Sequence, residues 1–314
     1  MKVLFVWSGL SGYMGDCWRA LAGAPGVELK VSVDVRSGLA GGSFDATDVM
    51  RDLDWSDRLP PDGWTPDIVF TVGWHNALCR AAATRRWGES VRKVCCFDMP
   101  WEWRVRKLAA RFVLWPYLRR FDAAFVNGAC AARYARWLGF RGARLYTGLI
   151  ATNLHRFGPP IGGAGFLYVG RESPEKGLDV LRAAHARYRA NGGTWPLKIV
   201  HGVSPDALGA VYAAADCFVL ASRHEPWGVV LVEAAAAGLP IICTSACGAR
   251  HEVVKGNGLV VKPGDVAALA AAMTEVSEGR RTFDLDAGRR LAADYSCEAW
   301  TARVLNICKE LCDA

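Results

Sequence analysis

The segment from residue 216 to 245 narrows the folds open to this chain more than any other. The run DCFVLAS (216–222) is short and apolar, which favours a buried strand. GVVLVEAAAAG (228–238) predicts a helix that stops at Gly238, two residues before Pro240. IICTS (241–245) then returns to a strand pattern. Two strands joined by one helix at this spacing are typical of a parallel crossover, so a parallel α/β sheet is expected.

The same alternation of strand and helix patterns occurs in two series along the chain. Between them lies HRFGPPIGGAG (155–165), whose glycines and prolines indicate a linker. We therefore predict an α/β protein with two Rossmann-like parallel-sheet domains, residues 1–157 and 158–314, facing a central cleft. The closing helix, CEAWTARVLNICKEL (297–311), is expected either in the second domain or packed back on the first. The predicted strands cover 2–7, 27–35, 67–74, 91–101, 123–128, 144–149, 166–170, 197–202, 216–222 and 241–245.

Composition excludes several classes of protein. Hydrophobic residues make up 52% and charged residues 22%, as in ordinary globular proteins. No apolar stretch approaches the length of a membrane span, and VLFVW (3–7) reads as a first strand rather than a signal peptide. The eleven cysteines are odd in number and form no CxxC motif. We expect reduced, mostly buried thiols, a cytoplasmic protein and no structural metal.

Charge is concentrated in the first half. Residues 80–144 hold 15 Lys and Arg against 4 Asp and Glu. Within this region WEWRVRKLAARFVLWPYLRR (101–120) predicts a basic helix with aromatic residues, which Pro116 ends or kinks. Such a segment favours a polyanion or an anionic lipid surface as partner, but a solvated basic face over a buried apolar stripe explains the pattern equally well.

Two glutamates surround the Pro-Trp-Gly corner of the opening segment. The loop before the helix lies at the carboxyl end of a strand, where ligands bind in parallel sheets. Backbone N–H groups from Gly228 to Val230 would open the helix and suit a phosphate. Glu225 and Glu233 would then accept hydrogen bonds from hydroxyl groups of the same ligand. The structural alternative is that Glu225 is an ordinary surface loop residue and that Glu233 pairs with a basic side chain, as we would expect for an arbitrary pair of glutamates.

Residues 166–265 resemble the C-terminal domain of family 4 glycosyltransferases, which are retaining enzymes of the GT-B fold. The resemblance rests on FLYVGRESPEKGLDVLRAA, HEPWGVVLVEAAAAGLPIICTSACGARHEVV and NGLVVKPGD in this order. It implies that Arg171 and Lys176 bind the diphosphate of a nucleotide sugar and stabilise it as it leaves. It also implies that Glu225 holds the sugar hydroxyls and Glu233 the ribose hydroxyls. The remaining donor-binding residues on this reading are Gly12, Trp227, Gly228, Val229 and Val230.

A weaker resemblance to acceptor-side domains acting on surface polysaccharides runs through FDMPWEW and FDAAFVNGACAARYARWLGF. Asp98 stands near a position where many members of the family carry a histidine, so it is a candidate catalytic or acceptor-binding residue. A helix N-cap before Pro100 is the structural alternative for Asp98. The acceptor-binding residues expected are Gly9, Trp74, His75, Asp98, Trp101 and Arg104.

The resemblance implies a hexosyltransferase that needs no cofactor or metal and uses a nucleotide sugar, most commonly a UDP-sugar, as co-substrate. Two DxD strings, at 52–54 and 284–286, follow no predicted strand, which disfavours a metal-dependent transferase. The acceptor is expected to be a saccharide or lipid-linked saccharide met in the cytoplasm or at the inner membrane face. Neither the sugar nor the nucleotide follows from the residues.

Two other functions fit parts of the sequence. A transferase that adds sugar to a hydroxymethylated base of duplex DNA would use the basic segment and its tryptophans. A sugar-nucleotide binding module without activity would keep the second-half motifs, although the complete set of Arg171, Lys176, Glu225 and Glu233 favours an enzyme.

Overall fold

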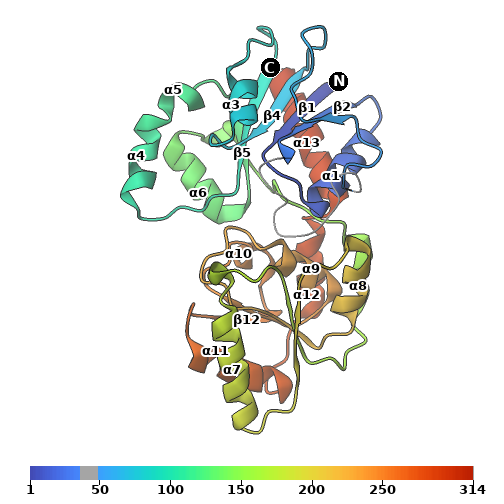
Figure 1. The fold of residues 1–314 in the computed structure, drawn as a ribbon, viewed down its shortest axis with the longest axis vertical. Coiled ribbons are helices and arrows are strands. Elements are labelled where there is room, and N and C mark those ends of the chain that lie inside the picture. Colours follow the sequence, from blue (N-terminus) through green and yellow to red (C-terminus); the bar gives the residue numbers. More distant parts are fainter. Residues whose placement is uncertain (36–48, 314) are drawn as a thin grey trace. The chain divides into compact units, whose positions relative to one another are not determined.

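The computed structural model describes residues 1–35 and 49–313 and divides them into two compact units (Figure 1). The first unit comprises Met1–Asn153 and Ser296–Ala314, and the second comprises Leu154–Tyr295. The first junction thus falls four residues before the expected one, at the start of the Gly/Pro-rich linker. The second junction returns residues 296–314 to the first unit, rather than leaving them in the second domain.

The first unit contains a seven-stranded parallel sheet in the order β3-β2-β1-β4-β5-β6-β7. Its central strands are apolar runs buried on both faces, as expected when helices cover both sides of a parallel sheet. Val3 of β1 pairs with Leu29 on one side and Ile68 on the other. The strands are β1 (Lys2–Trp7), β2 (Glu28–Val33), β3 (Trp55–Ser56), β4 (Ile68–Val72), β5 (Arg92–Phe97), β6 (Ala123–Val126) and β7 (Leu145–Thr147).

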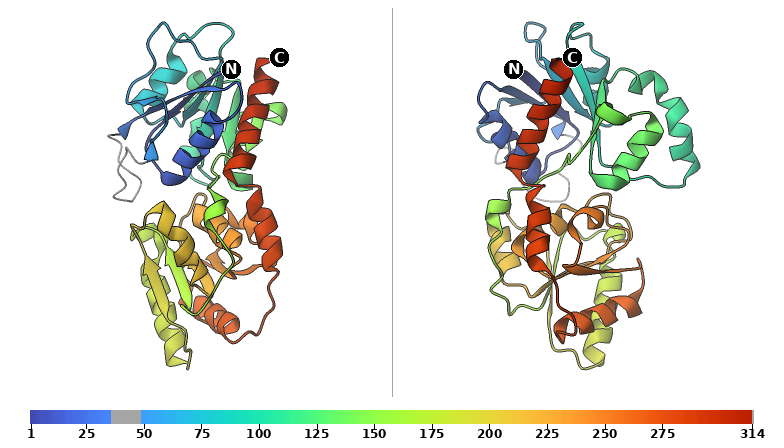
Figure 2. Two further views of the ribbon diagram at one scale, coloured as in Figure 1. Left: turned by 90° about the vertical axis from the view of Figure 1, so that its right-hand side faces the viewer. Right: turned by 180° about the vertical axis from the view of Figure 1, so that it is seen from behind.

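The last helix of the chain lies beside the first one in this unit (Figure 2). Trp300 is fully buried there, and its indole N–H donates to the Leu149 carbonyl at 2.7 Å. Its ring lies 5.5 Å from that of Phe5 in the central strand. The helices of this unit are α1 (Gly12–Ala22), α3 (Ala77–Thr84), α4 (Val105–Val113), α5 (Trp115–Leu118), α6 (Gly128–Leu138), η2 (Gly142–Arg144) and α13 (Cys297–Cys312).

The second unit contains a five-stranded parallel sheet in the order β12-β11-β10-β8-β9. The strands are β8 (Phe166–Val169), β9 (Leu197–Val200), β10 (Cys217–Leu220), β11 (Ile241–Thr244) and β12 (Gly258–Val261). The helices are η3 (Leu154–Arg156), η4 (Pro174–Lys176), α7 (Leu178–Ala190), α8 (Pro205–Ala213), α9 (Val229–Ala237), α10 (Arg250–Val253), α11 (Val266–Ser277) and α12 (Leu285–Ala293). The predicted α/β class with two parallel-sheet domains is confirmed.

Each sheet has one point at which the strand order reverses. In the first sheet this switch point lies between β1 and β4, and in the second it lies between β8 and β10. Loops leaving the two strands at such a point diverge to opposite faces of the sheet, which opens a crevice at the carboxyl ends. The two switch points are therefore the first places to look for ligand sites.

The helices differ in how far their local sequence explains them. Helix α1 begins at Gly12, inside the Gly-rich stretch SGLSGYMGD (8–16). Gly15 lies inside this helix, where the backbone of Val49 approaches it closely. A Cβ at this position would come within 2.5 Å of the Val49 carbonyl oxygen, so the close approach requires glycine. The basic helix begins at Val105 rather than near residue 101, and it ends at Val113 before Pro116, as predicted. Helix α12 was not anticipated.

The expectation of free, mostly buried thiols is confirmed within the described residues. All eleven cysteines are free thiols and nine of them are buried. No described helix combines the length and the apolar character that crossing a bilayer demands. The segment DATDVMRDLDWSDRLPPDGWTPD (45–67) is rich in aspartate; its residues 45–48 lie outside the described residues, and its part from 49 onward includes the short strand β3.

Candidate functional site

The second switch point carries the two cations that the sequence singled out. Arg171 follows the end of β8 by two residues, and its side chain is half exposed, 3.8 Å from Glu175. The Tyr168 hydroxyl donates to the Arg171 carbonyl at 2.9 Å, which fixes the backbone at this strand end. Lys176 ends the short helix η4 that follows. Both cations thus stand on the loop that leaves β8 at its carboxyl end.

Lys176 and Glu225 form an ion pair across the switch point. The Lys176 ammonium contacts the Glu225 carboxylate, and the two side chains are only 16% and 9% exposed. Glu225 lies in the loop after β10, the neighbour of β8 in the sheet. Its backbone is held from the other side, since its N–H donates to Ala246 and its carbonyl accepts from Gly248 at 2.9 Å. The sequence predicted roles for both residues but not this pairing.

A second set of contacts ties the same two loops together. Arg223 makes two side-chain hydrogen bonds to Asp179 at 2.7 and 2.6 Å, and its backbone N–H donates to the Glu175 carbonyl at 2.8 Å. The hydrogen bonds from Arg223 lower the pKa of Asp179 to about 2. Because these contacts join the η4 loop to the β10 loop, they hold the Lys176–Glu225 pair in register.

Helix α9 starts at Val229 after Gly228 and places Glu233 in its second turn. Glu233 is 5% exposed and accepts a hydrogen bond from the Tyr212 hydroxyl at 2.8 Å. Burial, reinforced by the charge of Glu233, raises the pKa of Tyr212 well above its usual value. Tyr212 therefore stays a neutral donor to the carboxylate. The first backbone N–H groups of α9, from Val229 and Val230, stand at a helix start, where such donors suit an anion.

Trp227 has a structural part in this loop. Its side chain is buried, its ring packs 5.1 Å from that of Tyr295, and its carbonyl accepts from the Ala249 N–H at 2.8 Å. Its ring is therefore not an open surface on which a sugar can stack. Two histidines stand near this loop. The backbone N–H of His224 donates to the Glu175 carbonyl. Burial, together with the charge of Arg250, lowers the pKa of His251.

A cavity of about 440 Å³ lies at the first switch point. His75 and Asp98, two of the expected acceptor residues, line it together. Both follow the carboxyl ends of adjacent strands, β4 and β5. The remaining lining residues are Ser8, Val72, Gly73, Asn76, Phe97 and Met99. Asp98 caps no helix, because the next helix has Arg104 at its N-cap, so the structural alternative for Asp98 is wrong.

The other expected acceptor residues do not all share this cavity. Trp74 is buried in the core against Phe97, at 5.6 Å between rings. Trp101 and Arg104 lie away from it: Trp101 lines a different cavity beside α6, and the Arg104 side chain pairs with Glu102 at 3.2 Å. Gly9 stands in the loop after β1, and Gly12 is the first residue of α1, which the dipole of a helix start makes suitable for an anion.

Sequence reasoning missed two residues that shape these sites. The first is Tyr212, which carries a signal of its own: a tyrosine in an Ala-rich helical pattern close to Glu225 and Glu233 is a candidate partner for a buried carboxylate. Asn76 lines the first cavity, caps α3 by accepting from the Leu78 and Cys79 N–H groups, and donates to Asp34 at 2.8 Å. An Asn directly before a helical pattern is a signal that was available.

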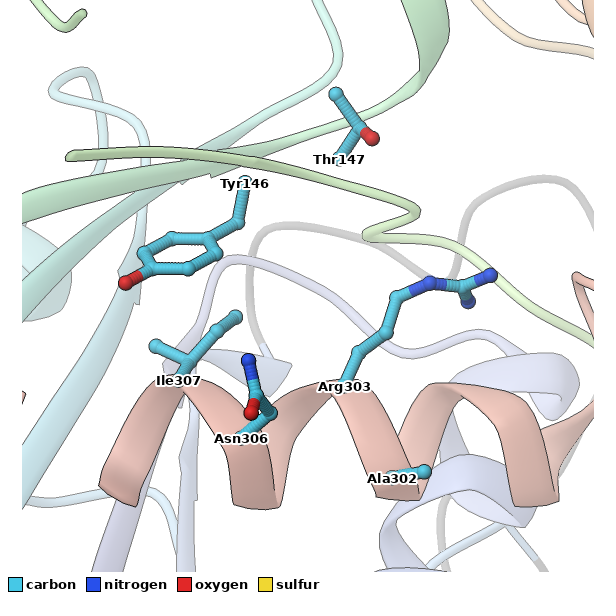
Figure 3. A pocket seen from close by; sticks show the side chains of 6 residues that line it. All are labelled: Tyr146, Thr147, Ala302, Arg303, Asn306 and Ile307. Carbon is cyan, nitrogen blue, oxygen red and sulfur yellow. The ribbon is translucent and has the colours of Figure 1, made fainter. Parts of the chain in front are cut away.

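A further cavity, of about 320 Å³, lies between the edge strand β7 and α13 (Figure 3). Figure 3 shows Tyr146 and Thr147 on the strand side, opposite Arg303, Asn306 and Ile307 of the helix. None of the predicted site residues lines it. Among the described residues, no group of His, Cys, Asp and Glu side chains is arranged to hold a metal ion. Asp284, from the second DxD string, instead caps α12 by accepting from the Ala287 N–H.

Known proteins resemble part of the second unit in sequence, and they resemble almost the whole chain in fold. Residues 196–288 match the family model described as glycosyl transferases group 1. A glycogen synthase from Mycobacterium tuberculosis is 35% identical over 144 residues, which is 38% of this chain and 35% of that protein. The O-antigen chain mannosyltransferase B of Escherichia coli is 34% identical over 113 residues, or 35% of this chain and 29% of that protein. The matches thus span about a third of these relatives' length.

Solved structures resemble the chain over almost its entire length. The lipopolysaccharide outer core galactosyltransferase WaaB has a TM-score of 0.72 at 15% identity, covering 98% of this chain and 99% of that one. The Anabaena protein HepE in complex with UDP has a TM-score of 0.73 at 15% identity, covering 99% and 100%. At this identity the likeness establishes the fold, which is GT-B.

Proposed function

We propose that this chain, a member of the GT4-type glycosyltransferases, moves a hexose from a nucleotide diphosphate sugar to a hydroxyl group of a saccharide or lipid-linked saccharide. The observation that carries the proposal is the Lys176–Glu225 pair at the switch point of the second sheet, inside a loop that Arg223 closes. Two of the predicted donor residues, Glu225 and Glu233, also lie inside residues 196–288, which match the family model described as glycosyl transferases group 1.

The donor reading assigns one task to each charged group. Arg171 and Lys176 bring two positive charges to one loop, which suits the two phosphates of the donor. A Lys ammonium has three N–H donors, so contact with Glu225 leaves others for phosphate oxygens. Glu225 accepts hydrogen bonds from sugar hydroxyls, and Glu233, oriented by Tyr212, accepts them from the ribose. We favour UDP as the nucleotide because the structurally similar HepE was solved with UDP and with UDP-glucose.

The reaction exchanges one glycosidic bond for another. The acceptor oxygen forms a bond to the anomeric carbon, the bond from that carbon to the diphosphate oxygen breaks, and the hydroxyl proton passes to the departing diphosphate. Attack on the face that the diphosphate leaves gives retention of configuration. Negative charge grows on the diphosphate as the bond breaks, so Arg171 and Lys176 act mainly through charge stabilisation, and the loops act through positioning.

The acceptor side of the proposal rests on the cavity that His75 and Asp98 line. Asp98 is suited to accept a hydrogen bond from an acceptor hydroxyl. Proteins similar to about a third of the chain include ones named for O-antigen and lipopolysaccharide core synthesis, which favours a glycan acceptor over DNA. Transfer to a modified DNA base is therefore not favoured.

A thermal-shift panel with UDP-, GDP- and TDP-glucose tests the donor site. Binding to the folded state stabilises it by about 2.7 kcal/mol at a hundredfold excess over Kd, so one nucleotide should raise the melting temperature by several degrees. Lys176→Gln should abolish the shift. Arg182 lies on the following helix, α7, and forms an exposed ion pair with Glu172. The control Arg182→Gln removes the same charge as Lys176→Gln and should preserve the shift. No response to any of the three donors would contradict the proposal.

The stereochemistry is tested on the product. With a donor that the panel identifies, the anomeric proton coupling of the transferred sugar should show the configuration of the donor. Inversion would contradict the retaining mechanism while leaving the donor site intact. Glu225→Ala should reduce transfer at least a hundredfold, in line with removal of a group that binds the reacting sugar, and activity equal to that of the wild type would exclude its proposed role.

A further inference from the structure

Helix α4 exposes the side chains that a surface helix normally buries. Of the nine large hydrophobic residues exposed in the described part of the chain, five lie on α4 or directly beside it. They are Trp103 (78% exposed), Val105 (82%), Phe112 (75%), Val113 (74%) and Trp115 (56%). A helix on a globular protein usually turns its apolar face to the core, so this arrangement points to a partner that the structure lacks.

The buried face of the same helix contains a charge. Lys107 is 7% exposed, donates to the Pro100 carbonyl and lies 3.4 Å from Glu102. Its ammonium also lies 5.1 Å from the centre of the Tyr134 ring on α6. Figure 1 shows α4 outside α6, on the side away from the sheet. Lys107 therefore anchors the helix to the first unit, and the apolar residues face outward as a consequence of this anchoring.

A cavity of about 340 Å³ opens next to these exposed residues. Its walls carry three arginines and three tryptophans. They are Arg133, Arg136, Arg141, Trp101, Trp103 and Trp137, and Leu108 completes the lining. None of the three arginines forms an ion pair with any residue of the described ranges 1–35 and 49–313. The concentration of positive charge in a hollow of this size suits a phosphate group.

Two donors in this cavity wall lack an acceptor. The indole N–H groups of Trp101 and Trp137 are buried and have no hydrogen-bond partner within the described part of the chain. A buried donor without an acceptor costs about 1–3 kcal/mol. Because the indole nitrogens themselves are buried, a shift of the Trp101 or Trp137 ring toward a bound phosphate would give them this acceptor.

We propose that the surface formed by α4 and the adjacent Arg/Trp cavity, the α4 surface, binds an anionic phospholipid membrane. Phe112, Val113 and Trp115 enter the boundary between headgroups and acyl chains, and the cavity holds the phosphate of one headgroup. A duplex DNA partner would also meet the arginines, but it offers nothing to protruding aliphatic side chains such as Val105 and Val113. The combination of exposed apolar residues with basic ones is the pattern of an interfacial helix.

Vesicle flotation tests the α4 surface without any nucleotide sugar, so its outcome is independent of the proposed transfer reaction. The full chain should float with vesicles of phosphatidylcholine mixed with phosphatidylglycerol and not with phosphatidylcholine alone. Each basic residue near an anionic surface contributes about a fivefold gain in binding, so the triple change Arg133→Gln/Arg136→Gln/Arg141→Gln should weaken binding about a hundredfold. Phe112→Ser/Val113→Ser, at positions too exposed to disturb folding, should weaken it at least tenfold.

Matched controls distinguish binding through the α4 surface from nonspecific effects of positive charge or exposed apolar side chains elsewhere on the chain. Arg182→Gln/Arg187→Gln/Arg189→Gln removes three arginines from α7 in the second unit, and Ile161→Ser removes an apolar side chain that is 88% exposed. Both controls should float like the wild type. Failure of the wild type to bind anionic vesicles, or equal losses in the controls, would overturn the proposal. So would duplex DNA that displaces the protein from vesicles and binds more tightly in the same buffer.

Discussion

At the scale of single residues, Glu233 offers the clearest test of how a donor would lie along the second unit. Its carboxylate is buried and already oriented by Tyr212, so it can accept further hydrogen bonds without first being ordered. A preoriented acceptor of this kind discriminates between ligands that have the matching hydroxyl group and ligands that lack it. The roles of Glu225 and Glu233 can therefore be separated by changing the ligand as well as the protein.

We expect the wild-type protein to bind UDP about 10- to 100-fold more tightly than 2′,3′-dideoxy-UDP, since hydrogen bonds to charged groups contribute about 1.5–3 kcal/mol. Glu233→Gln should lose most of this difference, and Glu225→Gln should keep it. Isothermal titration calorimetry with both nucleotides measures the four affinities. Equal discrimination in wild type and Glu233→Gln would mean that the ribose binds elsewhere.

The Arg223–Asp179 contact gives a prediction about pH. The folded pKa of Asp179 lies at about 2, below the ordinary aspartate value of 3.8, because Arg223 donates two hydrogen bonds to its charged form. The stabilising contribution of a carboxylate whose pKa is lowered is complete above 3.8 and is lost as the pH falls through about 2. The contact should therefore be intact throughout the neutral and mildly acidic range.

Carbon-13 NMR of the Asp179 carboxyl group measures this directly. Its titration midpoint should be near 2 in the wild type and should move up toward 3.8 in Arg223→Gln. Arg182→Gln, on the same unit but without contact to Asp179, should leave the midpoint in place. A midpoint that ignores Arg223 would show that the two loops are not joined in solution.

At the scale of elements, the close approach of η4 to strand β10 depends on Gly177. This residue has a φ of 65°, and a Cβ there would come within 2.3 Å of the Ala221 carbonyl. Gly192 has a φ of 89°, but no atom lies within 4 Å of its would-be Cβ. The two glycines thus share the left-handed backbone and differ in the contact.

Gly192→Ala should therefore show only the cost of a left-handed alanine, about 1–2 kcal/mol. Gly177→Ala should cost an additional 1–3 kcal/mol or so, since the loop must shift away from β10. It should also weaken nucleotide-sugar binding, because Lys176 is the residue directly before Gly177. Denaturant unfolding and the thermal-shift panel measure the two effects, and equal costs for both glycines would refute the contact argument.

Much of this element-scale structure could be predicted from the sequence. Buried parallel strands read as short apolar runs, as in 217–220 and 241–244, and Gly238 with Pro240 marks the end of α9. The start of α1 could not be predicted, because the need for Gly15 arises from a distant backbone segment at Val49. The separation of Trp101 from His75 and Asp98 could not be predicted either, because it depends on how the loop before α4 packs beside α6, where Trp101 lines a different cavity.

At the scale of the whole molecule, the chain crosses between the two units twice, and the first unit is discontinuous in sequence. The sequence pattern gave no way to choose between the two units for the last helix, because both offer an apolar surface to an amphipathic helix. In the structure α13 contributes Trp300, Val304 and Ile307 to the core of the first unit, and Cys297 lies 3.7 Å from Cys17 of α1. Folding of the first unit should thus await the end of the chain.

Three fragments test this dependence. Residues 154–295 are one contiguous unit with their own sheet and should unfold cooperatively when expressed alone, with any nucleotide binding retained. Residues 1–153 should not, because the loss of Trp300 alone corresponds to about 3–5 kcal/mol and several other core side chains leave with it. Thr152 and Ser296 are paired neighbours, so joining 1–153 to 296–314 through a flexible Gly/Ser linker should restore a folded first unit. Circular dichroism and tryptophan fluorescence measure the unfolding of each fragment. Cooperative unfolding of residues 1–153 alone would show that α13 is dispensable.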